Sequence, residues 1–298
     1  MSVVRRGDLA TDDCTVVRLL ISDYWRSTMP PEVRYHMLRP AQIVARRRAC
    51  PVVYIPIGTL EWHGFHNPVG ADTLQAEGLA ILCAQKGGGL VFPPLYYGEN
   101  RLEALMEANA ADRDLIAQGM ELSPDNFTAD RQPFGVTEQT LNYNHLLLHI
   151  LAEADSLGFQ VGVLVAGHYP LIDHARAAVL LFNQRQRNHR RGMLAWACLD
   201  YVLIQDRYPM AGDHAGGWET SHLLHLHPQT VDLMALPPKG QPMVGVHANP
   251  PRMAPQDATA EFGRETLEAS AEIIIKEVQH RLMHPEIYWG HGQSLREG

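Results

Sequence analysis

The chain has 298 residues, of which 46% are hydrophobic, and its 25 lysines and arginines against 33 aspartates and glutamates give a formal net charge of −8. This composition is typical of a globular protein with a substantial core, and the acidic balance argues against a general affinity for nucleic acid. No run approaches the roughly 18 to 20 apolar residues of a membrane helix, and the opening MSVVRRGDLATDD lacks the apolar region of a secretory signal. We therefore expect a cytoplasmic protein without nucleic-acid or membrane partners.

The counts of cysteine, arginine and histidine narrow the function further. The four cysteines are scattered without CxxC spacing, so we expect neither a disulfide framework nor a thiolate metal site. Arginine-rich runs at 45–49 and 185–191 lie near the ends of predicted helices, where cations complement the helix dipole; an anion or subunit contact is the alternative. The 16 histidines are more informative, because histidine is the commonest metal ligand.

Apolar runs of strand length alternate with helical patterns along the chain. The runs occupy residues 52–58, 89–95, 161–167 and 193–198. Such alternation predicts an α/β fold with a parallel sheet. Helices are expected from Glu138 to Leu157, with Thr137 as the cap and Gly158 just past the end, and from about 262 to 283. In the first of these helices, Leu141, His145, Leu148 and Ala152 share one face.

Two long segments lack strong periodicity. Residues 97–136 are polar, with one short helix expected around 101–121, and we interpret this insertion as a lid or a subunit arm over the mouth of the sheet. Residues 206–255 are rich in Pro, Gly and His and should wrap around the core. A single domain covering residues 1–298 is the simplest organisation.

The candidate chemistry begins where the first strand ends, in GTLEWHGFHNPVGADT at 58–73. Glu61 and His63 are two residues apart, so in an extended chain their side chains point the same way. The carboxyl ends of parallel strands are where open α/β sheets keep their ligand crevice. Oxygen and nitrogen ligands together suit Zn²⁺, Mn²⁺ or Fe²⁺ better than Ca²⁺. Asp72 can reach the same space, but its Asp-Thr-Leu-Gln context also fits a helix N-cap.

Two later motifs supply further polar residues. His168 ends the third strand in VLVAGHYP, so it should converge with Glu61 and His63 on one sheet edge. DHAGGWETS at 213–221 contains His214 before a glycine pair and Glu219 at the start of a predicted helix. The alternative for Glu219 is purely structural, because a carboxylate near a helix N-terminus is stabilised by the helix dipole.

These motifs together resemble the creatininase family. GTLEWHGFHNPVGADT is similar to the family signature G-S-x-E-Q-H-G-x-H-L-P-x-x-T-D, GHYP to its G-H-G-G-N or G-H-Y-E segment, HAGGWETS to its H-A-G-x-x-E-T-S, and WRSTMPPEV to its opening W-P-E-V. The resemblance covers roughly residues 25–225. It implies a three-layer α/β/α sandwich with a mainly parallel sheet, two divalent metals, and a homo-oligomer such as a hexamer. It further implies that the metal ligands are Glu61, His63, Asp72 and His168, with Asp72 bridging.

The chain departs from the family pattern at two positions. Trp62 replaces the usual Gln between the first two ligands, and Pro170 stands where creatininase itself supplies a second carboxylate. Proline cannot coordinate a metal through its side chain, so hydrolysis of creatinine is in doubt. Glu219 is the available substitute, either as a ligand of the second metal or as an acid/base group.

The resulting hypothesis is a metal-dependent hydrolase in which metal-activated water attacks a carbonyl of a small cyclic polar substrate, a cyclic amide or a keto-inositol ring. His214 would carry the proton, with Glu219 as the second catalytic residue. Substrate contacts are expected from Trp62, Arg101 and Trp218, with Tyr96 and Tyr97 nearby, although aromatic residues near loop ends often simply pack. The competing hypotheses are an inactive, metal-stabilised scaffold of the same fold and a nucleic-acid binder. The second is disfavoured because the sequence contains no known nucleic-acid-binding motif.

Overall fold

The computed structural model describes residues 31–98, 111–131, 133–187 and 192–288. Contacts divide the chain after Glu32, and the compact unit that begins at Val33 contains the elements discussed below. The strands are β1 Val52–Ile57, β2 Leu90–Val91, β3 Val161–Ala166 and β4 Leu194–Leu199. The α-helices are α2 Pro40–Ala49, α3 Ala71–Gly87, α4 Arg113–Gly119, α5 Val136–Ser156, α6 Leu171–Arg187, α7 Asp200–Ile204, α8 Gly217–Leu226, α9 Ala260–Met283 and α10 Pro285–Tyr288.

The four strands form one parallel sheet in the order β2-β1-β3-β4. β2, the next strand along the chain, lies on one side of β1, and β3 and β4 follow on the other side. The topological switch point therefore lies between β1 and β3. The parallel sheet predicted from the sequence is confirmed. The second strand is much shorter than expected, because Pro93 and Pro94 follow its two residues and proline has no N–H to donate to a ladder.

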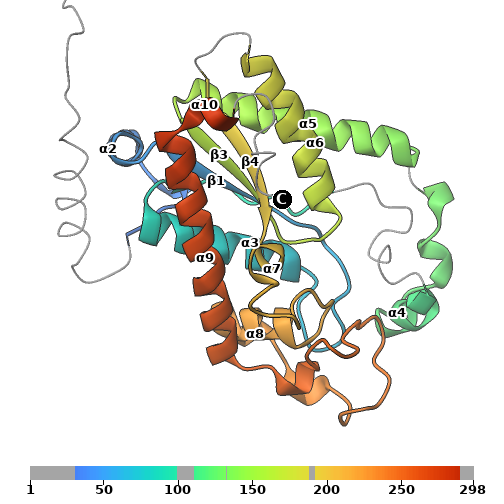
Figure 1. The fold of residues 1–298 in the computed structure, drawn as a ribbon. Helices are drawn as coiled ribbons and strands as arrows, with labels where there is room; N and C mark the ends of the chain where they lie inside the picture. The colour runs from blue at the N-terminus through green and yellow to red at the C-terminus, as the bar shows by residue number, and fades with distance from the viewer. Residues whose placement is uncertain (1–30, 99–110, 132, 188–191, 289–298) are drawn as a thin grey trace, which may run out of the picture. The chain divides into compact units, whose positions relative to one another are not determined.

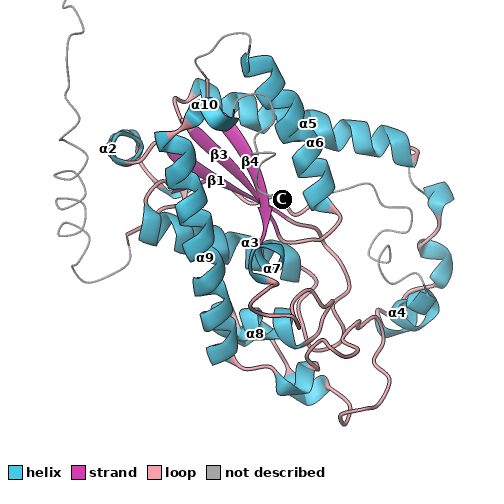
Figure 2. Cartoon of the chain, in the orientation of Figure 1, coloured by secondary structure: helices cyan, strands magenta, loops and turns pink. Residues whose placement is uncertain are grey.

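Helices cover both faces of this sheet. Alternate β1 residues point to opposite sides: Val53 and Ile55 join a core with α5 and α6, whereas Val52 and Tyr54 join a core with α3 and α9. Every residue of β1 is buried, as expected for an interior parallel strand. Figure 1 shows the two helical layers on either side of β1, β3 and β4, and Figure 2 shows the same strands enclosed by helices. The three-layer α/β/α architecture is thereby confirmed.

Helix α5 corrects two details of the sequence analysis. It begins at Val136, and the N–H of Gly135 donates to the Glu138 carboxylate at 3.1 Å, so Thr137 is inside the helix and not its cap. The face shared by the four residues packs only in part: Leu148 and Ala152 are partly buried against the core, whereas Leu141 is 52% exposed. The buried residues are Tyr143, Leu147, Leu151 and Ala154. Leucines occur all around this helix, so periodicity alone could not choose the face that packs on the sheet.

The two irregular segments contain more structure than their sequences suggested. In 97–136, residues 99–110 lie outside the described part of the chain, and α4 follows them. Ile116 of α4 packs with Trp62 and Phe127 in a small separate apolar cluster. In 206–255, α8 is followed by short 3-10 turns, and His214 pairs with His247 in an isolated antiparallel bridge. The assignment of 97–136 as a lid or arm stays a prediction.

Three compositional features can also be located. Arg46, Arg47 and Arg48 lie in the last turn of α2, as expected, whereas the side chains of the second arginine run lie outside the described residues. Cys50, Cys83 and Cys198 are free thiols, and Cys14 is not among the described residues. Within the described part, none of the helices has the length and apolarity needed to cross a bilayer.

A buried histidine ties the helices of one layer together. His222 of α8 is fully buried. Its Nδ1 lies 3.0 Å from the side-chain amide oxygen of Gln75 in α3, and its Nε2 lies 2.9 Å from the hydroxyl of Thr266 in α9. Burial lowers the pKa of His222 to about 3, so the ring is neutral in the folded protein.

We expect this histidine to make stability depend on pH. Below about pH 6.5, His222 takes up a proton in the unfolded chain but not in the folded one. The contribution of neutral His222 to the free energy of unfolding is therefore complete above that pH and is lost as the pH falls toward 3. The free energy of unfolding of the wild type should therefore fall about 1.4 kcal/mol more per pH unit than that of His222→Gln. Urea unfolding between pH 7.5 and 5 measures both slopes. His225→Gln, at an exposed position of the same helix, is the control; equal slopes in wild type and His222→Gln would contradict the assignment.

Candidate metal centre

The first turn of α3 lies against the carboxyl ends of β1 and β3. Two glycines permit this approach: a Cβ at Gly167 would lie 1.9 Å from the carbonyl oxygen of Asp72, and one at Gly58 would lie 2.6 Å from the amide nitrogen of Thr73. Asp72 is therefore held at the switch point. The N-cap position of α3 is occupied by Gly70, and Asp72 lies inside the helix. The capping interpretation of Asp72 is thus wrong, and its carboxylate is available for other contacts.

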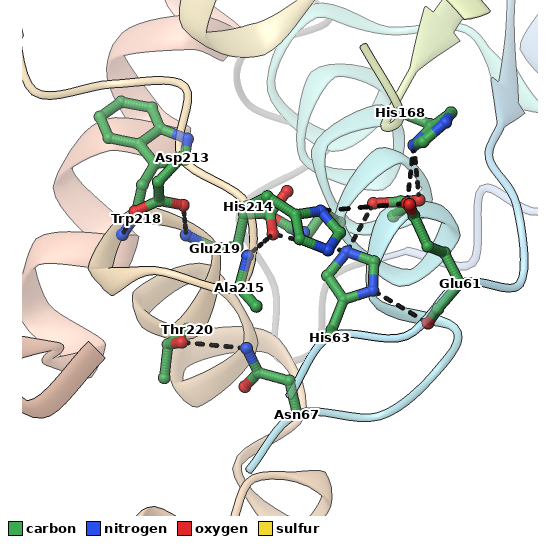
Figure 3. A network of polar contacts seen from close by, with 12 residues as sticks. Glu61, His63, Asn67, His168, Asp213, His214, Ala215, Trp218, Glu219 and Thr220 are labelled. Carbon is green, nitrogen blue, oxygen red and sulfur yellow. Dashed lines mark hydrogen bonds and ion pairs between the residues drawn. The ribbon is translucent and has the colours of Figure 1, made fainter. Parts of the chain in front are cut away.

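Asp72 places its two carboxylate oxygens between two histidines. Oδ1 lies 3.0 Å from Nε2 of His63, and Oδ2 lies 3.2 Å from Nδ1 of His168. The same His168 nitrogen is 3.1 Å from Oε2 of Glu61. All four residues are buried. Figure 3 shows the side chains of Glu61, His63 and His168 turned toward one another. The structure thus brings together the four residues that the sequence singled out as metal ligands.

The orientation of His63 is fixed by a local hydrogen bond. Its Nδ1 lies 3.0 Å from the carbonyl oxygen of Glu61, which can only accept, so Nδ1 carries a proton. Nε2 is therefore directed at the carboxylates of Asp72 and Glu219, the latter at 3.5 Å. Burial alone would lower the pKa of His63, but these two carboxylates outweigh it and raise the pKa to about 10. A metal-ligating histidine commonly has this arrangement, with the far nitrogen bonded to a carbonyl group.

Glu219 enters the cluster from the first turn of α8. Its Oε2 accepts a 2.7 Å hydrogen bond from the N–H of Ala215. Burial raises the pKa of this carboxyl well above its usual value. Pro170, by contrast, is exposed beside His168. A second carboxylate beside His63, in addition to that of Asp72, is therefore supplied by α8, and no carboxylate comes from the residue two positions after His168.

His214 lies beside His63, with ring centroids 4.4 Å apart. Its Nε2 donates to the carbonyl oxygen of Trp62 at 2.9 Å, and its Nδ1 is 3.9 Å from Oε2 of Glu61. Burial, together with the charge of His63, lowers the pKa of His214 to about 4. The ring is therefore neutral near pH 7, with Nδ1 on the side of the carboxylates.

The cluster has the chemistry of a divalent metal site. Three overlapping sets have their ligand atoms within 4.8 Å of one another: Glu61–Asp72–His168, His63–Asp72–Glu219 and Glu61–His63–His214. Among the described residues, Oε1 of Glu61 is buried without a hydrogen-bond partner, and Oε2 of Glu61 and Oδ2 of Asp72 share a single nitrogen, Nδ1 of His168, as their nearest polar neighbour. Buried carboxylates are costly unless they are paired or coordinate a metal. Mixed carboxylate and imidazole ligands fit Zn²⁺, Mn²⁺ or Fe²⁺.

A cavity of about 710 Å³ opens beside this cluster. Its wall includes Asp72, His168, His214 and Glu219, and also residues that follow β3 and β4. Tyr169 and Tyr201 stack in this wall, with centroids 6.2 Å apart and ring planes inclined by 21°. The cavity gives a small molecule access to the cluster.

The residues predicted to contact substrate have different positions. Trp218 lines the cavity but is 1% exposed, and its indole N–H donates to the Asp200 carboxylate at 3.0 Å. Trp62 is not among the residues lining the cavity; its indole N–H donates to the carbonyl oxygen of Val244. Arg101 lies outside the described residues. Tyr97 is 85% exposed, and Tyr96 packs near Gly70. Substrate contact by these residues stays a prediction.

Several residues of the site were not found from the sequence. Asp213 caps α8 from outside the helix: it accepts hydrogen bonds from the backbone N–H groups of Trp218 at 2.7 Å and Glu219 at 3.4 Å, and burial raises its pKa to about 7. Its position in DHAGG, just before a predicted helix, could have indicated a capping role. Tyr201 and Arg252 in the cavity wall gave no signal, because only the fold brings them near the motifs.

Comparison with known proteins agrees with this geometry. The sequence model of the creatininase family, described as creatinine amidohydrolase, matches residues 36–278. The chain belongs to the creatininase family. Creatinine amidohydrolase of Pseudomonas putida is 25% identical over 243 residues, which cover 76% of this chain and 84% of that protein. A 3-dehydro-scyllo-inosose hydrolase of Thermotoga maritima is 35% identical over 69 residues, only 23% of this chain and 22% of that protein. The predicted membership in a hydrolase family is therefore confirmed.

Solved structures support the fold assignment. A crystal structure of creatinine amidohydrolase superposes with a TM-score of 0.61 at 21% identity, covering 86% of this chain and 99% of that one. Related creatininase structures at 22% identity and a TM-score of 0.60 are described as a manganese form and a Zn–Zn form. At this level of identity the likeness shows the common fold.

We expect Gly167→Ala to disrupt the approach of α3. The added Cβ would collide with the backbone of Asp72, which cannot yield without moving the helix, so the free energy of unfolding should fall by about 1–3 kcal/mol. Urea unfolding measures the change. Gly135→Ala, where a Cβ would meet only the Glu138 carboxylate at 3.8 Å, is the matched control and should cost no more than about 1 kcal/mol. Equal losses in both variants would show that this close approach is unimportant.

Proposed function

We propose that this protein is a hydrolase that holds two divalent metal ions. Glu61, Asp72 and His168 would hold one ion, and His63, Asp72 and Glu219 the other, with Asp72 common to both. The observation that carries the proposal is the position of Asp72, whose two oxygens face different histidines at 3.0 and 3.2 Å. The names of the manganese and Zn–Zn creatininases support the choice of Mn²⁺ or Zn²⁺.

Glu219 takes the place of the carboxylate that Pro170 cannot supply. Its oxygen lies 3.5 Å from the same His63 nitrogen that faces Asp72, and the three residues form one candidate ligand set. This geometry favours the ligand role for Glu219 over a separate acid/base role.

Divalent ions bound there would lower the pKa of water and polarise a carbonyl group. The protein's own contribution to proton transfer is His214. Its Nε2–H is fixed on the carbonyl oxygen of Trp62, so Nδ1 is the nitrogen that takes up a proton on the side of Glu61 and releases it toward the leaving group. A neutral ring near pH 7 is the form required to accept that proton.

For the substrate we propose a small, polar, cyclic compound with a carbonyl group, either a cyclic amide or a keto-inositol. The cavity of about 710 Å³ is large enough for such a ring, and the stacked Tyr169 and Tyr201 offer an aromatic wall for it. The two hydrolases that match the sequence are named for substrates of these two kinds. Location in the cytoplasm and assembly into a homo-oligomer remain predictions.

The first test is metal content. Purified wild type is expected to contain close to two equivalents of Zn, Mn or Fe by elemental analysis, whereas Glu61→Ala and His168→Ala lose metal because each removes a buried ligand. His225→Ala, at an exposed histidine of α8, should retain the wild-type content. A wild type that stays metal-free after incubation with these ions would overturn the proposal.

The second test concerns turnover. With a substrate identified by screening lactams and keto-inositols, His214→Ala should lower kcat by about 10²–10⁴, as expected for loss of a general acid/base group, while its metal content is unchanged. Stopped assays of product together with elemental analysis separate the two effects. A metal-loaded wild type that hydrolyses none of these compounds would favour the inactive scaffold.

A further inference from the structure

The carboxylate of Glu219 is directed by a strained backbone position. Ala215, four residues earlier, has a φ of +55°, in the left-handed region that residues with a side chain rarely adopt. Its N–H donates to Oε2 of Glu219 at 2.7 Å, and that oxygen is the one 3.5 Å from His63. The direction of the Ala215 N–H therefore decides where this oxygen is held. A conformation of this kind persists only when surrounding contacts hold it.

His66 supplies the contact on the other side of Ala215. Its Nε2 lies 3.0 Å from the Ala215 carbonyl oxygen, and because a carbonyl only accepts, Nε2 is the donor. The two peptide planes that flank the Ala215 Cα are thus held by different partners, Glu219 on one side and His66 on the other. His66 is 2% exposed, and its ring is folded against Gly64, where a Cβ would lie 2.7 Å from Nδ1.

A second pair of contacts joins the same two segments. Nε2 of His66 is also 3.2 Å from the hydroxyl of Thr220, which accepts a 3.0 Å hydrogen bond from the side chain of Asn67. Figure 3 shows the contact between Asn67 and Thr220 beside Glu219 and Ala215. His66 and Asn67 therefore contact the chain on both sides of Glu219, at Ala215 before it and at Thr220 after it. Burial lowers the pKa of His66 to about 4, which keeps the ring neutral near pH 7.

We propose that His66 is a positioning residue: by holding the Ala215 carbonyl it keeps Ala215 in its left-handed conformation and so aims the Glu219 carboxylate at the position opposite His63. The segment 61–67 would then supply His63 directly and fix its partner Glu219 indirectly. This inference rests on the proposed metal pair, because it assigns His66 to only one of the two ion positions, the one that includes Glu219. The position formed by Glu61, Asp72 and His168 does not involve Ala215.

Zn²⁺ titration of the chelator-treated full chain, followed by calorimetry, tests this assignment. The wild type should bind two Zn²⁺ ions. His66→Leu should bind one ion as the wild type does and the other about 10–100-fold more weakly, the usual effect of losing a group that orients a ligand. His66→Gln, whose amide can still donate, should stay within a few-fold of the wild type. His225→Leu, at an exposed position of α8, controls for loss of a histidine.

The double variant His66→Leu/Ala215→Gly gives the sharper result. Glycine adopts a φ of +55° without steric cost, so it should recover most of the lost affinity if the role of His66 is to hold Ala215. Should His66→Leu fail to fold by circular dichroism, His66→Asn, which is too short to reach the carbonyl, replaces it in both experiments with the same expected results.

Two results would overturn the inference while leaving the metal pair intact. One is wild-type affinity for both ions in His66→Leu, and the other is an equal weakening of both ions that Ala215→Gly does not recover. A wild type that binds fewer than two Zn²⁺ ions overturns the metal pair, and the inference with it.

Discussion

The close packing of the first turn of α3 against the ends of β1 and β3 is the constraint on which the rest of the site depends. A helix can come this close to two strands only where they end in residues without a side chain, here Gly58 and Gly167. The result is that a carboxylate on the helix, Asp72, lies between histidines carried by the two strand ends. Backbone shape thus sets the spacing of the charged groups in the cluster.

Helix α8, which is distant in sequence from the first motif, is itself held firmly beside the cluster. Helix α8 brings Glu219 to the cluster, and it is held at its start by Asp213 and along its length by His222, which contacts both α3 and α9. Groups whose neighbours are fixed in this way are preorganised for binding, because little conformational freedom remains to be lost when a ligand arrives.

The sequence predicted the parts of this protein that follow from local pattern and topology. Apolar runs located three of the four strands closely, and the rule that parallel strands end at one edge placed Glu61 and His168 together. The sequence could not decide whether Asp72 caps α3 or joins the polar cluster, because that choice depends on how closely the helix approaches the strands. The face of α5 that packs on the sheet was found only in part, because several faces of this helix carry leucine. His66 lay within a recognised motif, but its partner, the Ala215 carbonyl, is a backbone atom 149 residues away.

The exposed Pro170 has an implication for how such a protein can diversify. It lines the cavity next to His168, whereas the second carboxylate beside His63, that of Glu219, comes from α8. Exposed residues after β3 thus shape part of the cavity wall without adding a carboxylate to the cluster, although His168 belongs to both. Substitutions at these exposed positions can therefore change this part of the wall without replacing any charged residue of the cluster.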